Sequence, residues 1–191
     1  MKHASSRALY AYWDSLRAGR AAPERSDLDP GAIRASLGDV FLLELAAGEQ
    51  QIVRLAGTRI CTLLGREWTG RPFVEPFAPE DRAQLLRLIG RVADMATPAV
   101  AATAGRTADG RTLDLEMLIL PLRHRGRARA RVLGALSATE WPYWAGGVPL
   151  AQLHVASARY LQPEKADDID LVSAPVAADY PLLRVLPGGR G

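Results

Sequence analysis

The chain has 191 residues, of which 48% are hydrophobic and 24% are charged, and its formal net charge is +3. These values indicate one globular domain with an appendage and exclude a largely disordered chain or two domains of ordinary size. Apolar runs stay below the roughly 20 residues that cross a bilayer, and Asp14 and Arg17 interrupt the region where an export signal needs an apolar stretch. We therefore expect a cytoplasmic protein without a membrane segment.

Cysteine content and charge narrow the chemistry further. Cys61 is the single cysteine, so one chain can form neither an internal disulfide nor a thiol metal cluster. Lysine occurs only at Lys2 and Lys165, so nearly all the positive charge is arginine. The net excess is too small to indicate nucleic acid as a partner, and we do not expect one.

The first expected elements are helical. Residues 5–18 predict an amphipathic helix, for which Ser5 or Ser6 can supply the cap. Its apolar face is formed by Leu9, Tyr12, Trp13 and Leu16. Residues 19–28 show no periodicity and predict a loop. Asp29-Pro30 then predicts the start of a short helix that Gly38 ends.

Strand and helix patterns alternate from residue 40 onward. Residues 40–45 and 51–56 predict an antiparallel hairpin with its turn at 47–49. Residues 58–64 predict a helix of two turns that ends at Gly65, and residues 68–77 predict a loop. Pro79, Glu80 and Asp81 open the longest expected helix, which ends before Thr97-Pro98.

Three more strands complete the expected sheet. Residues 99–107 predict a strand, Asp109-Gly110 a two-residue turn, and the alternation from Thr112 to Ile119 a partner strand with one inward face. A basic loop at 123–127 precedes the last strand at 131–139. We therefore divide the chain into an N-terminal helical cap (1–37), a sheet domain (38–145) and a Pro/Gly-rich C-terminal extension (146–191), in which 152–161 can form a short helix.

This order of elements, with antiparallel strands and helices inserted after the second strand, resembles the PAS fold. More specifically, residues 4–145 are similar to a family of small standalone bacterial PAS-domain proteins of the alphaproteobacterial type, formerly a domain of unknown function. The matching residues are Tyr12-Trp13, Leu16-Arg17, Arg20, Asp29-Pro30, Ile33-Arg34, Arg54-Leu55-Ala56-Gly57-Thr58, Gly65-Arg66-Glu67 and Thr69-Gly70.

The resemblance implies an α+β fold with a PAS-like five-stranded antiparallel sheet, helices packed on one face and an amphipathic helix in front. It also implies a sensory domain that dimerises through the leading helix and holds a ligand between sheet and helices. The candidate ligand-binding residues are Arg54, Leu55, Thr58, Arg59, Cys61, Leu64, Trp68, Met117, Ile119 and Leu136. The competing interpretation is that the apolar members fill a solid core and that Arg54 pairs with Glu44.

No cofactor is identified from the sequence. The three histidines fall near the N-terminus (His3), in a hairpin loop (His124) and in the extension (His154), so a histidine-ligated haem is not expected. Cys61 lies near the position where light-sensing PAS relatives carry a reactive cysteine. Its neighbours lack the asparagine, arginine and glutamine pattern of those flavin domains, so we expect a buried, inert thiol and no flavin.

Two surface features have competing interpretations. The cluster from Arg123 to Arg131 suits an acidic partner, a dinucleotide or nucleic acid, but it also suits a solvated hairpin that discourages strand pairing, which we favour. The run Trp141-Pro142-Tyr143-Trp144 can cover the sheet or form a dimer interface.

The leading hypothesis is a cytoplasmic PAS sensor or adaptor that binds a small molecule or a protein partner and is not an enzyme. The second is a pure interaction scaffold with a solid core. The third is an enzyme built on a curved sheet, for which Asp114 and Glu116 are the only carboxylates on the relevant strand. Alternation places both opposite the core face, and an acid in a cavity would favour that third hypothesis.

Overall fold

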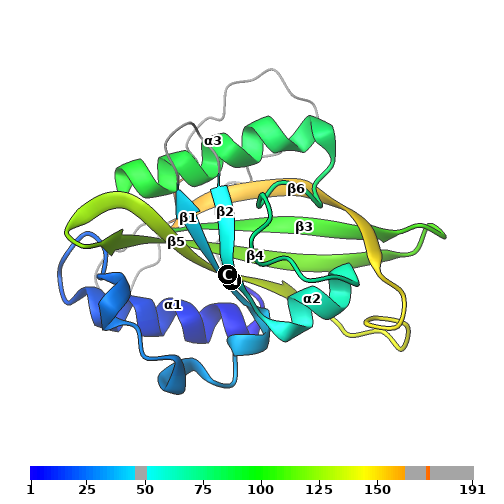
Figure 1. The fold of residues 1–191 in the computed structure, drawn as a ribbon, viewed down its shortest axis with the longest axis horizontal. Coiled ribbons are helices and arrows are strands. Elements are labelled where there is room, and N and C mark those ends of the chain that lie inside the picture. The colour runs from blue at the N-terminus through cyan, green and yellow to red at the C-terminus, as the bar shows by residue number, and fades with distance from the viewer. Residues whose placement is uncertain (46–50, 162–170, 173–191) are drawn as a thin grey trace.

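The computed structural model describes residues 1–45, 51–161 and 171–172, so the expected turn at 47–49 and most of the tail lie outside the described residues. Its centre is an antiparallel sheet in the order β2-β1-β5-β4-β3-β6-β7 (Figure 1). The strands are β1 (Val40–Leu45), β2 (Gln51–Ala56), β3 (Ala99–Thr107), β4 (Thr112–His124), β5 (Arg127–Ala138), β6 (Leu150–Leu161) and the short β7 (Leu171–Val172). The five expected strands are present, and β6 extends the sheet beyond them.

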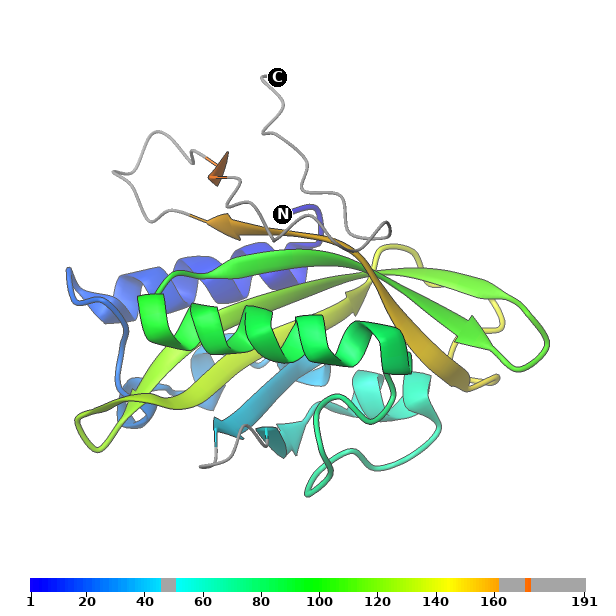
Figure 2. The same ribbon diagram turned by 90° about the horizontal axis from the view of Figure 1, so that it is seen from above.

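Three α-helices accompany the sheet: α1 (Ala4–Arg17), α2 (Thr58–Leu64) and α3 (Pro79–Met95). Their predicted bounds are confirmed to within a residue. Figure 2 shows α1 and α3 on opposite faces of the sheet. The helices inserted after β2 therefore share one face, as expected, while the leading helix packs on the other. None of these helices is long and apolar enough to cross a membrane.

The leading helix α1 is fastened to the sheet by its apolar face. Leu9 and Trp13 are fully buried, and the indole Nε1 of Trp13 donates a 2.8 Å hydrogen bond to the carbonyl of Pro121 in β4. The cap differs from the prediction, because His3 and not Ser5 or Ser6 occupies the capping position, where its Nδ1 accepts from the amide of Ser5. An imidazole nitrogen satisfies one of the free amides of the first turn as a hydroxyl would.

Residues 150–161 correct the prediction of a short helix, because they form β6 and pair with β3 along its whole length. The register shifts twice along this pair, between Ala102 and Thr103 and between Arg106 and Thr107. Each shift adds one residue to β6, so its inward residues are spaced by three and two positions in turn. The inward residues are Leu150, Leu153, Val155, Ala158 and Tyr160. This broken alternation imitates a helical period.

The basic loop expected at 123–127 is shorter than predicted. Strand β4 continues to His124 and β5 begins at Arg127, which leaves a two-residue turn of Arg125 and Gly126. Both turn residues have positive φ, +52° and +73°. That backbone matches the twist of a tight hairpin, and glycine adopts it without strain.

Candidate functional site

The segment from Arg54 to Gly70 contains seven of the ten candidate ligand-binding residues, and its backbone follows the prediction. The amide of Gly57 donates to the carbonyl of Val40 at 2.8 Å, and α2 starts at the next residue. Gly65 ends α2 with φ of +65°. Since Ile60, Leu63 and Leu64 face inward, the rest of the helix faces away from the core. The ten candidate residues are therefore divided between the surface and the interior.

Arg54 is held by an ion pair and does not face the core. Its Nε donates to the carboxylate of Glu44 at 2.5 Å, as the competing interpretation proposed. Arg131 on β5 contacts the same carboxylate. Hydrogen bonds from Arg54 and then from Arg131 lower the pKa of Glu44 to about 2. The three charges link β1, β2 and β5 on the sheet surface.

The depressed pKa of Glu44 predicts acid sensitivity at this junction. A carboxylate whose pKa falls on folding stabilises the protein fully above its unfolded pKa, here 4.5, and this contribution is lost as the pH falls toward about 2. Glu44→Gln should therefore be less stable than the native chain near neutral pH, and the difference should shrink through that acid range. Urea unfolding of both proteins measures it; a difference that does not change with pH would contradict the assignment.

Arg59 also forms an ion pair within the protein, with Asp39. Its Nε and one terminal nitrogen donate to the two oxygens of Asp39 at 2.7 and 2.9 Å. The hydroxyl of Ser5 in α1 donates to the same carboxylate at 2.7 Å. Hydrogen bonding to Asp39 raises the pKa of Arg59 further. The pair links α1, the end of the 3₁₀ turn Leu37–Asp39 and α2.

Cys61, Leu55 and Thr58 lie toward the outside of the molecule. Leu55 and Thr58 are exposed, and Cys61 is half-buried, which corrects the expectation of a buried thiol. The Cys61 Sγ lies 3.6 Å from a carboxylate oxygen of Glu67, and burial is the main cause that raises its pKa. Burial thus disfavours the thiolate, which is the reactive form of this side chain.

The remaining candidates gather in the interior between the sheet and helices α2 and α3. Leu64, Trp68, Met117, Ile119 and Leu136 all belong to one buried cluster. Four aromatic rings of this cluster contact one another: Phe41, Trp68, Phe73 and Phe77. We call these four residues the aromatic core.

The aromatic core is closely packed. The ring centroids of Trp68 and Phe73 are 5.0 Å apart and stacked, and Phe73 lies 5.1 Å from Phe41 and 5.5 Å from Phe77. Each of the four side chains is no more than 1% exposed. The indole Nε1 of Trp68 is buried there without a hydrogen-bond partner among the described residues. The sequence signal for this packing was present, but spacing alone could not distinguish a lined pocket from a filled core.

The aromatic core lies between the sheet and helices α2 and α3, where the PAS resemblance implies a ligand. Cys61 is directed toward Glu67 and the carbonyl of Ala56, not toward the aromatic core.

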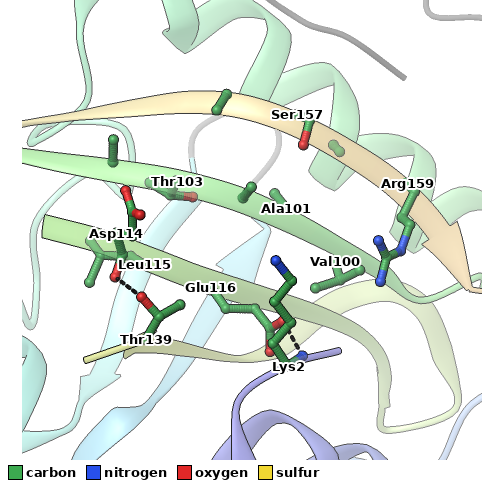
Figure 3. Close-up of a pocket in the computed structure, with 14 residues that line it drawn as sticks. Lys2, Val100, Ala101, Thr103, Asp114, Leu115, Glu116, Thr139, Ser157 and Arg159 are labelled. Carbon is green, nitrogen blue, oxygen red and sulfur yellow. Dashed lines mark hydrogen bonds between the residues drawn. The ribbon is translucent and has the colours of Figure 1, made fainter. Parts of the chain in front are cut away.

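Sequence reasoning missed a second candidate site, because part of its lining belongs to β6, which was not predicted as a strand. An open pocket of about 300 Å³ lies on the α1 side of the sheet, over β3, β4 and β6 (Figure 3). We call it the outer pocket. Its lining includes Lys2, Ala102, Ala104, Asp114, Glu116, Thr139, Ser157 and Arg159.

Glu116 lies at the edge of the outer pocket and supports α1. Its carboxylate accepts hydrogen bonds from the amides of Lys2 at 2.6 Å and His3 at 3.0 Å. Burial acts to raise the pKa of Glu116, but these hydrogen bonds outweigh it and the pKa is lowered. Asp114 and Glu116 both lie on the face away from the core, as alternation predicted, but both line the outer pocket, which is the placement that favours the enzyme hypothesis. Because the carboxylate of Glu116 already accepts hydrogen bonds from two backbone amides, it is poorly suited to accept a proton from a substrate.

The arginine cluster on the β4–β5 hairpin is largely paired. Arg123 contacts Glu24 at 3.1 Å, and Arg129 contacts Asp94 at 3.2 Å. With Arg131 bound to Glu44, three of the arginines fasten the hairpin to its surroundings. This supports the structural interpretation of the cluster.

The histidines are dispersed, as expected. His3 caps α1, His124 ends β4, and the Nδ1 of His154 lies 3.6 Å from the carboxylate of Asp81. Within the described residues, no group of three histidine, cysteine, aspartate or glutamate side chains could hold a metal ion.

The loop between β5 and β6 presents aromatic side chains to solvent. Trp141 is 49% exposed and Tyr143 is 95% exposed. The loop is ordered by backbone hydrogen bonds from Gly147 and Val148 to the carbonyl of Trp144, each 3.0 Å long. We call residues 141–148 the aromatic loop.

Solved structures resemble the chain only at low identity. A LOV domain studied with a flavin analogue has 15% identity and a TM-score of 0.46, with 56% of this chain and 82% of that chain covered. The LOV protein of Rhodobacter sphaeroides has 18% identity and a TM-score of 0.44, with 55% and 63% covered. The PAS domain of an HTR-like protein from Haloarcula marismortui has 19% identity and a TM-score of 0.41, with 56% and 89% covered.

The sequence comparisons give a clearer result. No curated protein matches the chain. A family model described as PAS domain matches residues 1–137, from α1 to the end of β5, and leaves out β6. On this match over most of its length, the chain belongs to the PAS domain family.

Proposed function

We propose that the chain is a signalling adaptor that binds a protein partner through its surface and carries out no catalysis. The observation that supports this proposal is the aromatic core, whose four buried rings contact one another between the sheet and helices α2 and α3. PAS domains are typically sensory and signalling modules. A PAS domain with a filled interior can still signal if a partner recognises its surface.

The aromatic loop is the surface best suited to a partner. Trp141 and Tyr143 are exposed within one loop, and Trp and Tyr side chains are enriched among the residues that dominate the energetics of protein interfaces. The guanidinium of Arg111 lies 5.9 Å from the ring centroid of Trp144, which fixes the base of the loop. The rings of Trp141 and Tyr143 are thus presented from a structured turn, and binding them costs little ordering entropy.

Removing both rings tests this proposal. We expect the double variant Trp141→Ala, Tyr143→Ala to bind a partner captured by the native chain at least about 30-fold more weakly, since truncating a hot-spot ring costs about 2 kcal/mol. Met95→Ala is the matched control, because Met95 is also a large exposed apolar residue but lies at the end of α3. The affinity of the purified partner is measured by calorimetry. A partner that binds the double variant as tightly as it binds the native chain would contradict the proposal.

A small-molecule sensor is the second candidate function. It is favoured by the Nε1 of Trp68, which is buried without a partner among the described residues and could donate to a ligand. A thermal-shift screen against metabolites and nucleotides, repeated on Trp68→Phe, tests it. Stabilisation that is lost in Trp68→Phe would favour the sensor over the adaptor.

A homodimer through α1 stays a prediction. Leu9 and Trp13 already face the sheet, so such a dimer has to use the other faces of the helix, where Tyr12 is half-buried. Cytoplasmic location also stays a prediction.

A further inference from the structure

We infer that the outer pocket binds a small organic carboxylate, whose anionic group is held by Arg159 and Lys2 and whose far end carries a hydrogen-bond donor facing Asp114. The site lies on the opposite face of the sheet from the aromatic core. It does not depend on the proposed function.

The main observation is that the guanidinium of Arg159 has a buried nitrogen without a hydrogen-bond partner in the described part of the chain. Its Nε is buried, yet it has no hydrogen-bond partner among the described residues, and none of the ion pairs found there includes Arg159. A guanidinium stays charged at any physiological pH, and a buried donor without an acceptor costs free energy. A carboxylate supplies two acceptor oxygens in the geometry that the planar guanidinium fits.

Lys2 supplies a second cation at the same end of the outer pocket. Its backbone amide donates to Glu116, and none of the ion pairs found within the described part of the chain includes its ammonium group. Figure 3 shows the side chains of Lys2 and Arg159 extending into the pocket near Val100. Glu116 is engaged by two amides, so its oxygens are only partly available to neutralise these cations.

The floor of the outer pocket provides the space. Ala102 and Ala104 of β3 and Ser157 of β6 project only short side chains on this face. The volume of about 300 Å³ is at the lower end of the range of ligand pockets, roughly 300–1,000 Å³. A small molecule fits it better than a nucleotide.

The charge at the far end selects the ligand class. Asp114 pairs with Ala104, whereas Arg159 pairs with Val100, four residues away along β3. This places the two groups about 13 Å apart along the strand before their side chains reach inward. A dicarboxylate or a phosphate ester of similar length would bring negative charge toward Asp114. A monocarboxylate that ends in an amine complements both ends.

Three related probes test the site in an NMR titration of the full chain: 5-aminopentanoate, pentanoate and pentylamine. We expect 5-aminopentanoate to shift the amides of Ala102, Ala104 and Ser157 with the highest affinity, pentanoate to bind more weakly, and pentylamine to leave these amides unchanged. Inorganic phosphate is the fourth probe. Phosphate binding more tightly than 5-aminopentanoate would overturn the carboxylate assignment.

Variants separate the two ends of the site. Arg159→Gln should weaken 5-aminopentanoate at least about tenfold, the effect of losing one charged hydrogen bond, while Arg91→Gln on the exposed face of α3 should have no effect. Asp114→Asn should remove the preference for 5-aminopentanoate over pentanoate. Circular dichroism checks that each variant folds, and Arg159→Lys, which keeps the charge, should retain part of the affinity. The inference is wrong if 5-aminopentanoate does not shift these amides, or if it binds Arg159→Gln as it binds the native chain.

Discussion

Replacing Trp68 with alanine is expected to lower the free energy of unfolding by about 3–5 kcal/mol, the largest effect of any single change considered for this chain. Trp68 is fully buried and touches two other rings of the aromatic core, with centroid distances of 5.0 Å to Phe73 and 6.2 Å to Phe41. Alanine would leave a cavity that the neighbouring rings can fill only in part. Urea unfolding with a fluorescence-independent readout measures the change.

Trp68→Phe is the matched control for this prediction. Phenylalanine keeps most of the ring area and removes the indole N–H that has no partner among the described residues. Because an unpaired buried donor is costly, we expect Trp68→Phe to cost less than about 1.5 kcal/mol or to stabilise the protein. A loss close to that of Trp68→Ala would show instead that the N–H has an acceptor, either a buried water or a ligand.

Gly57→Ala is expected to destabilise the protein by about 3 kcal/mol, at the upper end of overpacking effects. A methyl group at Gly57 would overlap the carbonyl oxygens of Leu37 and Gly38. Both obstacles are backbone atoms, so a change of rotamer cannot relieve the overlap. The amide of Gly57 also bonds to Val40, and any shift would disturb the link between β1 and α2.

The control for Gly57→Ala is the same substitution in α3. Gly90 is inside the helix, and a methyl group there meets only one arginine nitrogen at 4.0 Å. Helix propensity then predicts that Gly90→Ala raises stability by about 0.5–1 kcal/mol. Opposite signs for the two substitutions, measured by thermal and urea unfolding, are the expected result. Equal effects would mean that Gly57 has room that the structure does not show.

Local patterns predicted most of the fold because each element carries its own signal. The helix at Pro79–Met95 combines proline in its first turn, two acids and a regular apolar face, and its predicted bounds are confirmed. The prediction of a helix within residues 150–161 was wrong for an equally local reason. Two register shifts of β6 against β3 disturb the alternation of inward and outward residues on which strand prediction relies. A shift is set by the partner strand, so no pattern within residues 150–161 reveals it.

The candidate site was harder to predict than the fold. The PAS resemblance placed Leu64, Trp68 and Met117 around one interior space. The structure brings them into one buried cluster, in which the rings of Trp68 and Phe73 are stacked. Arg54 and Arg59 were plausible anchors until their partners, Glu44 and Asp39, were placed. Arg159 could not be considered at all, since its role requires β6 beside β3.

Native mass spectrometry of the full chain tests the central claim most directly, which is that side chains fill the interior of this PAS domain. The native chain and Arg159→Gln are compared, so that occupancy of the outer pocket can be recognised. We predict that Arg159→Gln carries no bound small molecule and has the mass of the bare polypeptide or its multimers. A molecule retained by both proteins and released only on unfolding would contradict the claim.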